Sequence, residues 1–215
     1  MTVTLPADTD TVTTEDLRRF TNTMIDRAQG LLRRCQDVDV TFLPQDPLAH
    51  DPGAEPGHEQ NAAWTLGHII VHMTASAEES AALAAELARG VAYHGRSRRE
   101  VPWQGVTTLA HCRARLEESR HLCVASLGMW PDRPDLANTY VPWEGAAPMG
   151  AIARYLLGLR HEATHLEQLR DVTDQARADR RRKTLWGRWR SRSRRRPDSE
   201  ADSQQDRLAP QSSRT

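Results

Sequence analysis

Four stretches of the chain repeat their apolar residues at the spacing of an α-helix, and no stretch shows the sustained alternation of a β-strand. Long proline-containing segments lie between them. Helices are expected at about residues 13–38, 62–89, 107–127 and 148–180. Four amphipathic helices with long connections predict an all-α fold, a four-helix bundle in which the apolar stripes face one another.

Residues of the types that favour helix ends lie at these bounds. Thr13 followed by Asp16 resembles a capping box, although Glu is more usual than Asp at the later position. The other predicted boundary residues are Asn61, Gly90, Thr107 or Thr108, and Pro148. The apolar stripe of the first helix consists of Leu17, Phe20, Met24, Leu31, Cys35 and Val38. The Ala-rich second half of the second helix permits close helix packing.

Charge divides the chain into an acidic domain and a basic tail. Residues 1–179 contain 17 basic and 25 acidic residues, and residues 180–215 contain 12 basic and 4 acidic residues. We expect an N-terminal extension (1–12), a helical domain (13–179) and an Arg-rich, disordered tail (180–215). The tail also contains Trp186 and Trp189, so nucleic acid or an anionic membrane is an alternative to a merely solvated extension.

The three cysteines predict a reducing compartment. Cys35, Cys112 and Cys123 are odd in number and show no CxxC spacing, so we interpret them as buried thiols in a cytoplasmic protein. The N-terminus has no basic segment followed by an apolar one, which is what a signal peptide requires. No stretch approaches the length of a membrane-spanning helix.

Histidines supply the candidate chemistry. The fourth helix contains the sequence HEATH, with His161 and His165 one turn apart, and the second helix contains His68 and His72 at the same spacing. Two imidazoles at this spacing can bind one ion, and a third ligand from another helix would complete a site with an open position. From spacing alone, satisfied core or surface histidines explain the HEATH pair equally well.

Acidic residues lie near these histidines on the expected helix faces. Glu162 falls between two apolar stripes, and Glu79 and Glu86 share the face of His72. Each is expected either to orient a ligand histidine or to pair with an arginine. A di-iron carboxylate centre is rejected, because Glu118 and His121, which would form its second Glu-x-x-His motif, fall on the polar side of the third helix.

Together these residues resemble the DinB-like metalloprotein superfamily. The matching pattern is Trp64 at the start of the second helix, His72 eight residues later, and HEATHLEQLR late in the last helix. The resemblance covers about residues 13–178. It implies a four-helix bundle that binds one divalent ion through His72, His161 and His165. His68 has no counterpart in the family pattern and is expected at most to line the pocket.

The resemblance also implies a function. Members include metal-dependent transferases and an isomerase that use low-molecular-weight thiols such as mycothiol, so we expect a zinc, nickel or iron ion, a small-molecule substrate, a thiol and a homodimer. No side chain is expected to act as the nucleophile. Loop residues Tyr140, Trp143 and Glu144, and Trp103 from the preceding loop, are predicted to wall the pocket. The alternative is a non-enzymatic metal-binding or partner-binding bundle whose basic tail carries the function.

Overall fold

The predicted all-α class is confirmed. A computed structural model of the chain describes residues 4–46, 63–98 and 100–193, and no β-strand occurs among them. The elements in chain order are α1 (Thr14–Leu32), α2 (Asp37–Val40), α3 (Leu66–Ala88), η1 (Trp103–Gly105), α4 (Leu109–Leu127) and α5 (Ala151–Ser193). Within the described part of the chain, no helix has both the length and the hydropathy that crossing a bilayer requires.

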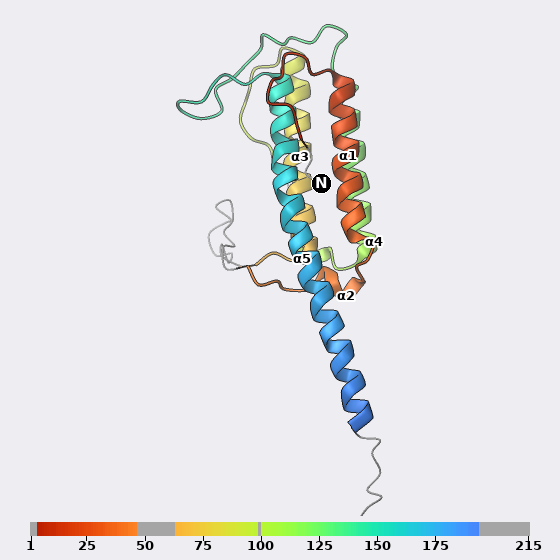
Figure 1. Ribbon diagram of the computed structural model, residues 1–215. Coiled ribbons are helices and arrows are strands. Elements are labelled where there is room, and N and C mark those ends of the chain that lie inside the picture. The colour runs from red at the N-terminus through yellow and green to blue at the C-terminus, as the bar shows by residue number, and fades with distance from the viewer. Residues whose placement is uncertain (1–3, 47–62, 99, 194–215) are drawn as a thin grey trace, which may run out of the picture. The chain divides into compact units, whose positions relative to one another are not determined.

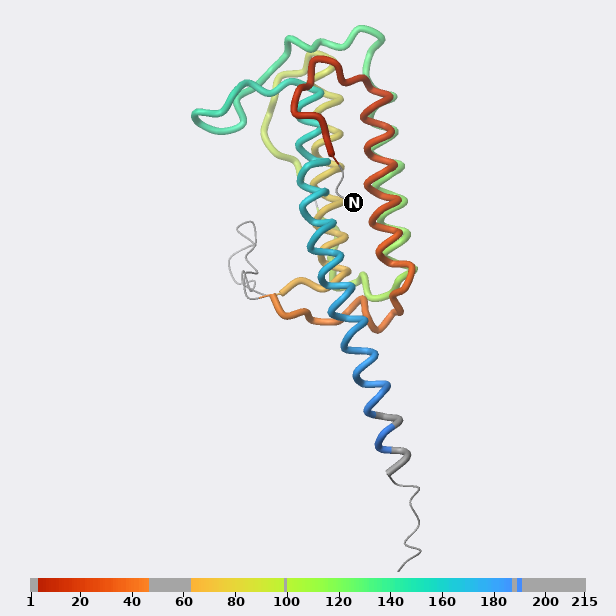
Figure 2. Tube along the Cα trace, viewed as in Figure 1, coloured from red at the N-terminus to blue at the C-terminus, as the bar shows by residue number. Residues whose placement is uncertain are grey.

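The chain forms two compact units, Met1–Arg177 and Ala178–Thr215, and α5 runs through the boundary. In the first unit α1, α3, α4 and the first part of α5 pack lengthwise (Figure 1). Helices α3 and α4 run in one direction, and α1 and α5 run in the other (Figure 1). The segment between α3 and α4 therefore has to return along the bundle, as the chain trace shows (Figure 2).

Of the four predicted helix starts, two have the expected cap, and α5 begins at Ala151, after Pro148 rather than with it in the first turn. The Thr13 hydroxyl accepts from the Asp16 N–H at 3.2 Å, and the Asp16 carboxylate accepts from the Thr13 N–H at 3.1 Å. Thr108 caps α4 in the same way. The predicted start of α3 at Asn61 was wrong, because α3 begins at Leu66 after its N-cap residue Thr65. Asn61 lies outside the described residues.

The last helix continues farther than expected. It was predicted to end near Arg180, and the tail from there to be disordered, but the helix extends to Ser193. Residues 181–186 contain strong helix formers and no proline, and Asp179 forms ion pairs with Arg182 and Lys183 one turn later. Polar, low-complexity composition alone does not stop a helix. The remainder of the tail, 194–215, lies outside the described residues.

The first helix is shorter than its apolar pattern suggested. It ends at Leu32, and the separate turn α2 follows, with the Gln36 N–H donating to the Asp39 carboxylate at 2.7 Å. Val38 is consequently 64% exposed, whereas Val40 is fully buried. Extending the stripe to Val38 was therefore incorrect, since the helix restarts in a different phase.

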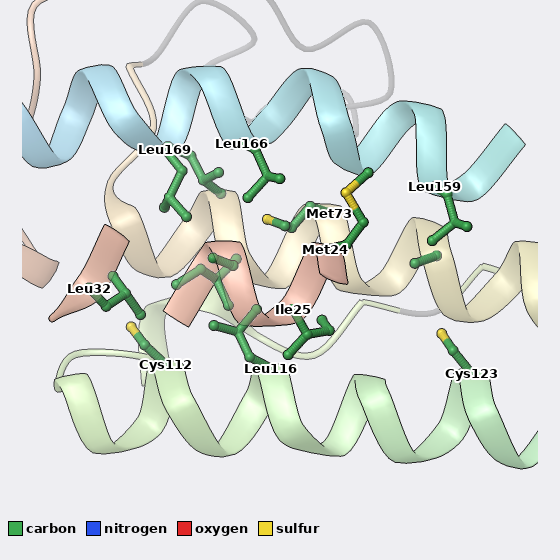
Figure 3. Close-up of a cluster of buried hydrophobic side chains, with 14 of the residues drawn as sticks. Met24, Ile25, Leu32, Met73, Cys112, Leu116, Cys123, Leu159, Leu166 and Leu169 are labelled. Carbon is green, nitrogen blue, oxygen red and sulfur yellow. The ribbon is translucent and has the colours of Figure 1, made fainter. Parts of the chain in front are cut away.

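One apolar core joins the four long helices (Figure 3). Met24 and Ile25 of α1, Met73 of α3 and Leu116 of α4 are at most 1% exposed. Helix α5 contributes Leu156, Leu159, Leu166, Leu169 and Val172. Burying each of these large side chains stabilises the fold by about 1.5–3 kcal/mol.

Small residues bring α3 and α5 into close contact, which the Ala-rich half of α3 permits. A Cβ added at Gly158 would lie 2.5 Å from the Ser80 Cβ and 3.2 Å from the Ala77 Cα. Only a glycine fits at that point without displacing α3. This close packing holds the histidine-bearing faces of α3 and α5 next to each other.

Candidate metal centre

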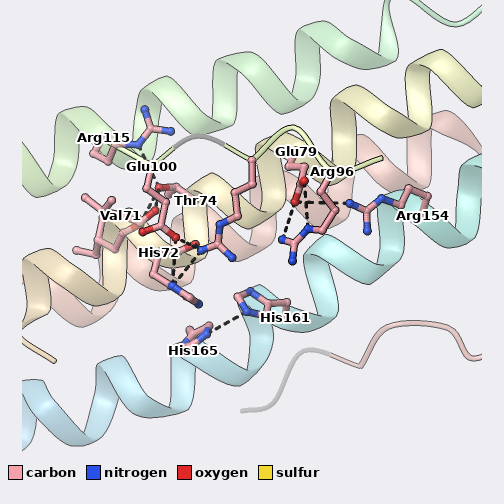
Figure 4. Close-up of polar contacts among 12 residues, drawn as sticks. Val71, His72, Thr74, Glu79, Arg96, Glu100, Arg115, Arg154, His161 and His165 are labelled. Atoms are coloured by element: carbon pink, nitrogen blue, oxygen red, sulfur yellow. Dashed lines mark hydrogen bonds and ion pairs between the residues drawn. The ribbon is translucent and has the colours of Figure 1, made fainter. Parts of the chain in front are cut away.

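Three histidines from two helices converge on one point (Figure 4). One nitrogen from each of His72, His161 and His165 lies within 4.8 Å of the other two. The Nε2 atoms of His161 and His165 are 3.3 Å apart. In a tetrahedral site with metal–nitrogen bonds of about 2.0–2.1 Å, ligand nitrogens are about 3.3–3.4 Å apart. The pair from α5 thus already has the spacing of two ligands to one ion.

The ring orientation of His165 is set by its own helix. Its Nδ1 lies 2.8 Å from the Oε1 of Gln168, one turn further along α5. Because an amide oxygen can only accept, Nδ1 donates the proton, and the lone pair of the imidazole is left on Nε2, which faces His161. Sequence analysis missed Gln168, although its spacing of three residues from His165 was a usable signal.

His161 is held in its neutral form. Burial, together with the positive charges of His165, His72, Arg98 and Arg96, lowers its pKa to about 3. Its Nδ1 is buried and has no hydrogen-bond partner among the described residues. A neutral imidazole is the form that binds a transition metal.

His72 is oriented by the returning segment between α3 and α4. Its Nδ1 lies 3.3 Å from the Glu100 carboxylate and 2.9 Å from the Arg98 guanidinium, which also donates to the His72 carbonyl at 3.0 Å. These two neighbours favour opposite tautomers. Metal binding through Nε2 requires the one in which Nδ1–H donates to Glu100.

Glu100 is suited to that role. The hydrogen bond with His72 and the charge of Arg98 outweigh burial and lower the pKa of Glu100, so the group is a carboxylate near neutral pH. Neither Glu100 nor Arg98 was identified from the sequence, because both lie in an irregular segment far from the histidines along the chain.

Aromatic rings cover one side of the three histidines. Trp64 stacks on His165, with ring centroids 5.6 Å apart, and lies tilted on His72 at 4.5 Å. His68 is stacked between Trp64 at 4.5 Å and Trp103 at 4.6 Å. His68 therefore packs beside the three histidines through Trp64, and Trp103 packs on the other face of His68.

The returning segment is fastened to α3 at both sides of the site. Glu79 accepts from Arg96 at 2.9 Å and from the Ser97 N–H at 3.0 Å, and Arg154 of α5 lies 3.7 Å away. Burial alone would raise the pKa of Glu79, but the hydrogen bond and charge of Arg96 with the charge of Arg154 lower it. Of the two predicted roles, Glu79 thus has the one of pairing with arginine.

On the other side of the three histidines, the segment between α3 and α4 packs closely against α3 at Gly67. A Cβ at Gly67 would lie 2.2 Å from the Val106 carbonyl oxygen. This contact brings η1, and Trp103 with it, close to His68. Glu86, the other acidic residue considered, hydrogen-bonds to His94 at 2.8 Å instead of approaching the three histidines.

Glu162 is the unusual acidic group. It is 1% exposed, and its Oε1 has no hydrogen-bond partner within the described part of the chain. Burial raises its pKa to about 8, and the charge of Arg120 offsets only part of that effect. No ion pair joins it to an arginine among the described residues, so neither predicted role, orienting a ligand or pairing with arginine, is seen at Oε1.

The predicted wall residues of the last loop have other neighbours. Tyr140 stacks on Tyr93 with centroids 3.8 Å apart and donates to the Met149 sulfur at 3.7 Å. Trp143 is 61% exposed, and Glu144 is also exposed. Their predicted role in walling the pocket stays a prediction.

The polar side of α4 has the orientation expected from its sequence. Glu118 and His121 are both exposed, which supports the rejection of a di-iron centre. The thiols are buried, and desolvation raises the pKa of both Cys112 and Cys123 to about 12. They stay protonated near neutral pH, so neither is a thiolate nucleophile.

Comparison of the chain with protein-family models, with curated proteins and with solved structures found no significant match. The resemblance to DinB-like proteins accordingly depends on the tryptophan and histidine pattern described above.

Proposed function

We propose that the protein binds one divalent ion through His72, His161 and His165 and that it is a metal-dependent transferase of the DinB-like type. The convergence of three imidazoles from α3 and α5 carries this proposal. A low-molecular-weight thiol such as mycothiol is the proposed co-substrate, and a small electrophile is the proposed acceptor.

The donor set fits the ion. Imidazole nitrogens bind zinc, nickel and iron, and three protein ligands leave a coordination position open, as in catalytic sites. Gln168 and Glu100 provide the hydrogen bonds that fix two of the three rings. Such supporting contacts are typical of metal-ligating histidines.

The protein's own residues would prepare the site for a thiol. A divalent ion bound by neutral ligands keeps its charge and lowers the pKa of a coordinated thiol. The stacked rings of Trp64, His68 and Trp103 pack beside the histidines and would help to keep water from one side of the ion. Arg98 and Glu100 form an ion pair beside His72, so together they orient the ring without adding net charge to the site.

Binding and turnover should be tested separately. Cobalt-loaded protein is titrated with mycothiol, bacillithiol or N-acetylcysteine while the visible absorption of the ion is followed. Binding of sulfur to the ion should add a sulfur-to-metal charge-transfer band. The band should be absent for His161→Ala and present for His111→Ala, which alters an exposed histidine of α4.

Turnover is measured as loss of free thiol in the presence of a panel of electrophiles. Zinc-, nickel- or iron-loaded protein should consume thiol with at least one electrophile, and His161→Ala should not. If the ion binds but no thiol is bound or consumed, the transferase proposal is wrong and the protein is a metal-binding bundle without this activity.

A further inference from the structure

The second compact unit begins with a helical segment that has an exposed apolar face. Leu185, Trp186 and Trp189 are 66%, 58% and 64% exposed. At about 100° per residue they lie within an arc of about 100° on α5. We call these three residues the Leu-Trp stripe. Exposing three large apolar side chains side by side to water is unfavourable, so burying this face against another apolar surface would be favourable.

Basic residues surround the stripe. Arg181, Arg182, Lys183 and Arg190 are all exposed. Arg181 and Arg190 lie on opposite sides of the stripe by helical position, and the Arg190 guanidinium stacks over the Trp186 ring at 4.7 Å. Residues 178–193 contain seven basic residues and one acidic residue. The partner should therefore be anionic.

Asp179 offsets only one of the seven positive charges in residues 178–193. It forms ion pairs with Arg182 and Lys183 near the N-terminal end of this segment. Arg182 lies on the same face as the Leu-Trp stripe, one turn earlier. Its long aliphatic stem can lie along an apolar surface while the guanidinium reaches water.

We propose that residues 178–193 bind the surface of an anionic lipid membrane as an amphipathic helix lying in the plane of the interface. A continuous apolar stripe with leucine and two tryptophans, bordered by arginine and lysine, is the composition that inserts at the boundary of headgroups and acyl chains. Single-stranded nucleic acid instead favours aromatic rings spaced along a basic groove. The Leu-Trp stripe is a compact face, and leucine adds nothing to base stacking.

The proposal is independent of the metal site, because it rests on different residues from those that form that site. It assigns the basic unit to locating the protein at a membrane surface. The first unit would then meet lipid-soluble electrophiles where they are concentrated.

The test uses the full chain and co-sedimentation with vesicles. Vesicles of phosphatidylcholine mixed with phosphatidylserine should bind the protein, and vesicles of phosphatidylcholine alone should bind it at least about tenfold more weakly. Trp186→Ser with Trp189→Ser should weaken binding to the anionic vesicles by more than about tenfold. Quenching of tryptophan fluorescence by brominated lipid should be lost in the same variant.

Two control variants distinguish binding through the Leu-Trp stripe and its basic border from nonspecific binding to vesicles. Trp143→Ser removes an exposed tryptophan of the first unit and should leave vesicle binding unchanged. Arg181→Gln with Arg190→Gln should weaken binding to anionic vesicles and reduce its dependence on lipid charge, because five of the seven basic residues remain. Far-ultraviolet circular dichroism checks that each variant keeps its helical content.

Three results would overturn the proposal. One is no binding to anionic vesicles. Another is binding that the double tryptophan variant leaves unchanged. The third is binding to a single-stranded DNA oligonucleotide without binding to vesicles, which would assign the basic helix to nucleic acid.

Discussion

Replacing Glu162 by Gln should remove a loss of stability that the native protein undergoes as the pH rises. The carboxyl group is 1% exposed, and burial raises its pKa to about 8 from an ordinary value of 4.5. Between these two values the unfolded chain releases the proton while the folded protein keeps it. Alkaline pH therefore favours the unfolded state at this residue.

The size of the effect follows from the two pKa values. Each unit of difference corresponds to about 1.4 kcal/mol, so Glu162 lowers the free energy of unfolding by up to about 5 kcal/mol between pH 4.5 and pH 8. His161, whose pKa burial lowers to about 3, has the opposite effect, because its stability contribution is lost as the pH falls from 6.5. Comparing Glu162→Gln with the native protein isolates Glu162, since His161 is present in both.

Urea unfolding should be measured at several pH values between about 5 and about 8 in the presence of a chelator. The stability of Glu162→Gln relative to the native protein should rise by several kcal/mol across this range. Glu167→Gln removes an exposed carboxyl group of the same helix and should follow the native curve. A constant difference between Glu162→Gln and the native protein would refute the view that Glu162 is buried without a partner for its charge.

Two further substitutions test the contacts that build the site. Glu100→Gln should weaken metal affinity by about 10–100-fold, because it removes the carboxylate beside His72 Nδ1. Glu144→Gln, in an exposed loop, should leave the affinity unchanged. Competition with a chromophoric chelator measures both affinities, and equal values for the two variants would contradict a role for Glu100. Gly158→Ala should lower the free energy of unfolding by about 1–3 kcal/mol, because the new Cβ would clash with Ser80. Gly30→Ala in α1 has open space around the new Cβ and should raise the free energy of unfolding by about 0.5–1 kcal/mol. Thermal unfolding measures both changes, and no loss of stability for Gly158→Ala would refute the close packing of α3 and α5.

The sequence predicted the features that depend on local periodicity. Apolar spacing located the four long helices, and the side chains of Thr13 and Thr108 marked two of their starts. The i and i+4 spacing placed His161 and His165 on one face of α5 because helical geometry alone ensures it. The outward orientation of Glu118 and His121 followed from the same argument.

Features that depend on tertiary contacts were beyond sequence reasoning. The turn α2 that follows the break after α1 is tied to α4, because the Asp37 carboxylate accepts from the Leu109 N–H, and a continued apolar stripe concealed the break. The positions of Arg98 and Glu100 depend on an irregular segment that Glu79 and Gly67 hold against α3. No periodicity describes such a segment, so the residues that orient His72 emerged only from the structure.

The most direct test of the account is elemental analysis of the purified protein beside its His72→Ala and His161→Ala variants, with His111→Ala as the control. The account predicts about one divalent ion per chain in the native protein and in His111→Ala, and loss of the ion in the other two variants. Native protein without metal, even after reconstitution with zinc, nickel or iron, would contradict it. So would full metal content in both His72→Ala and His161→Ala.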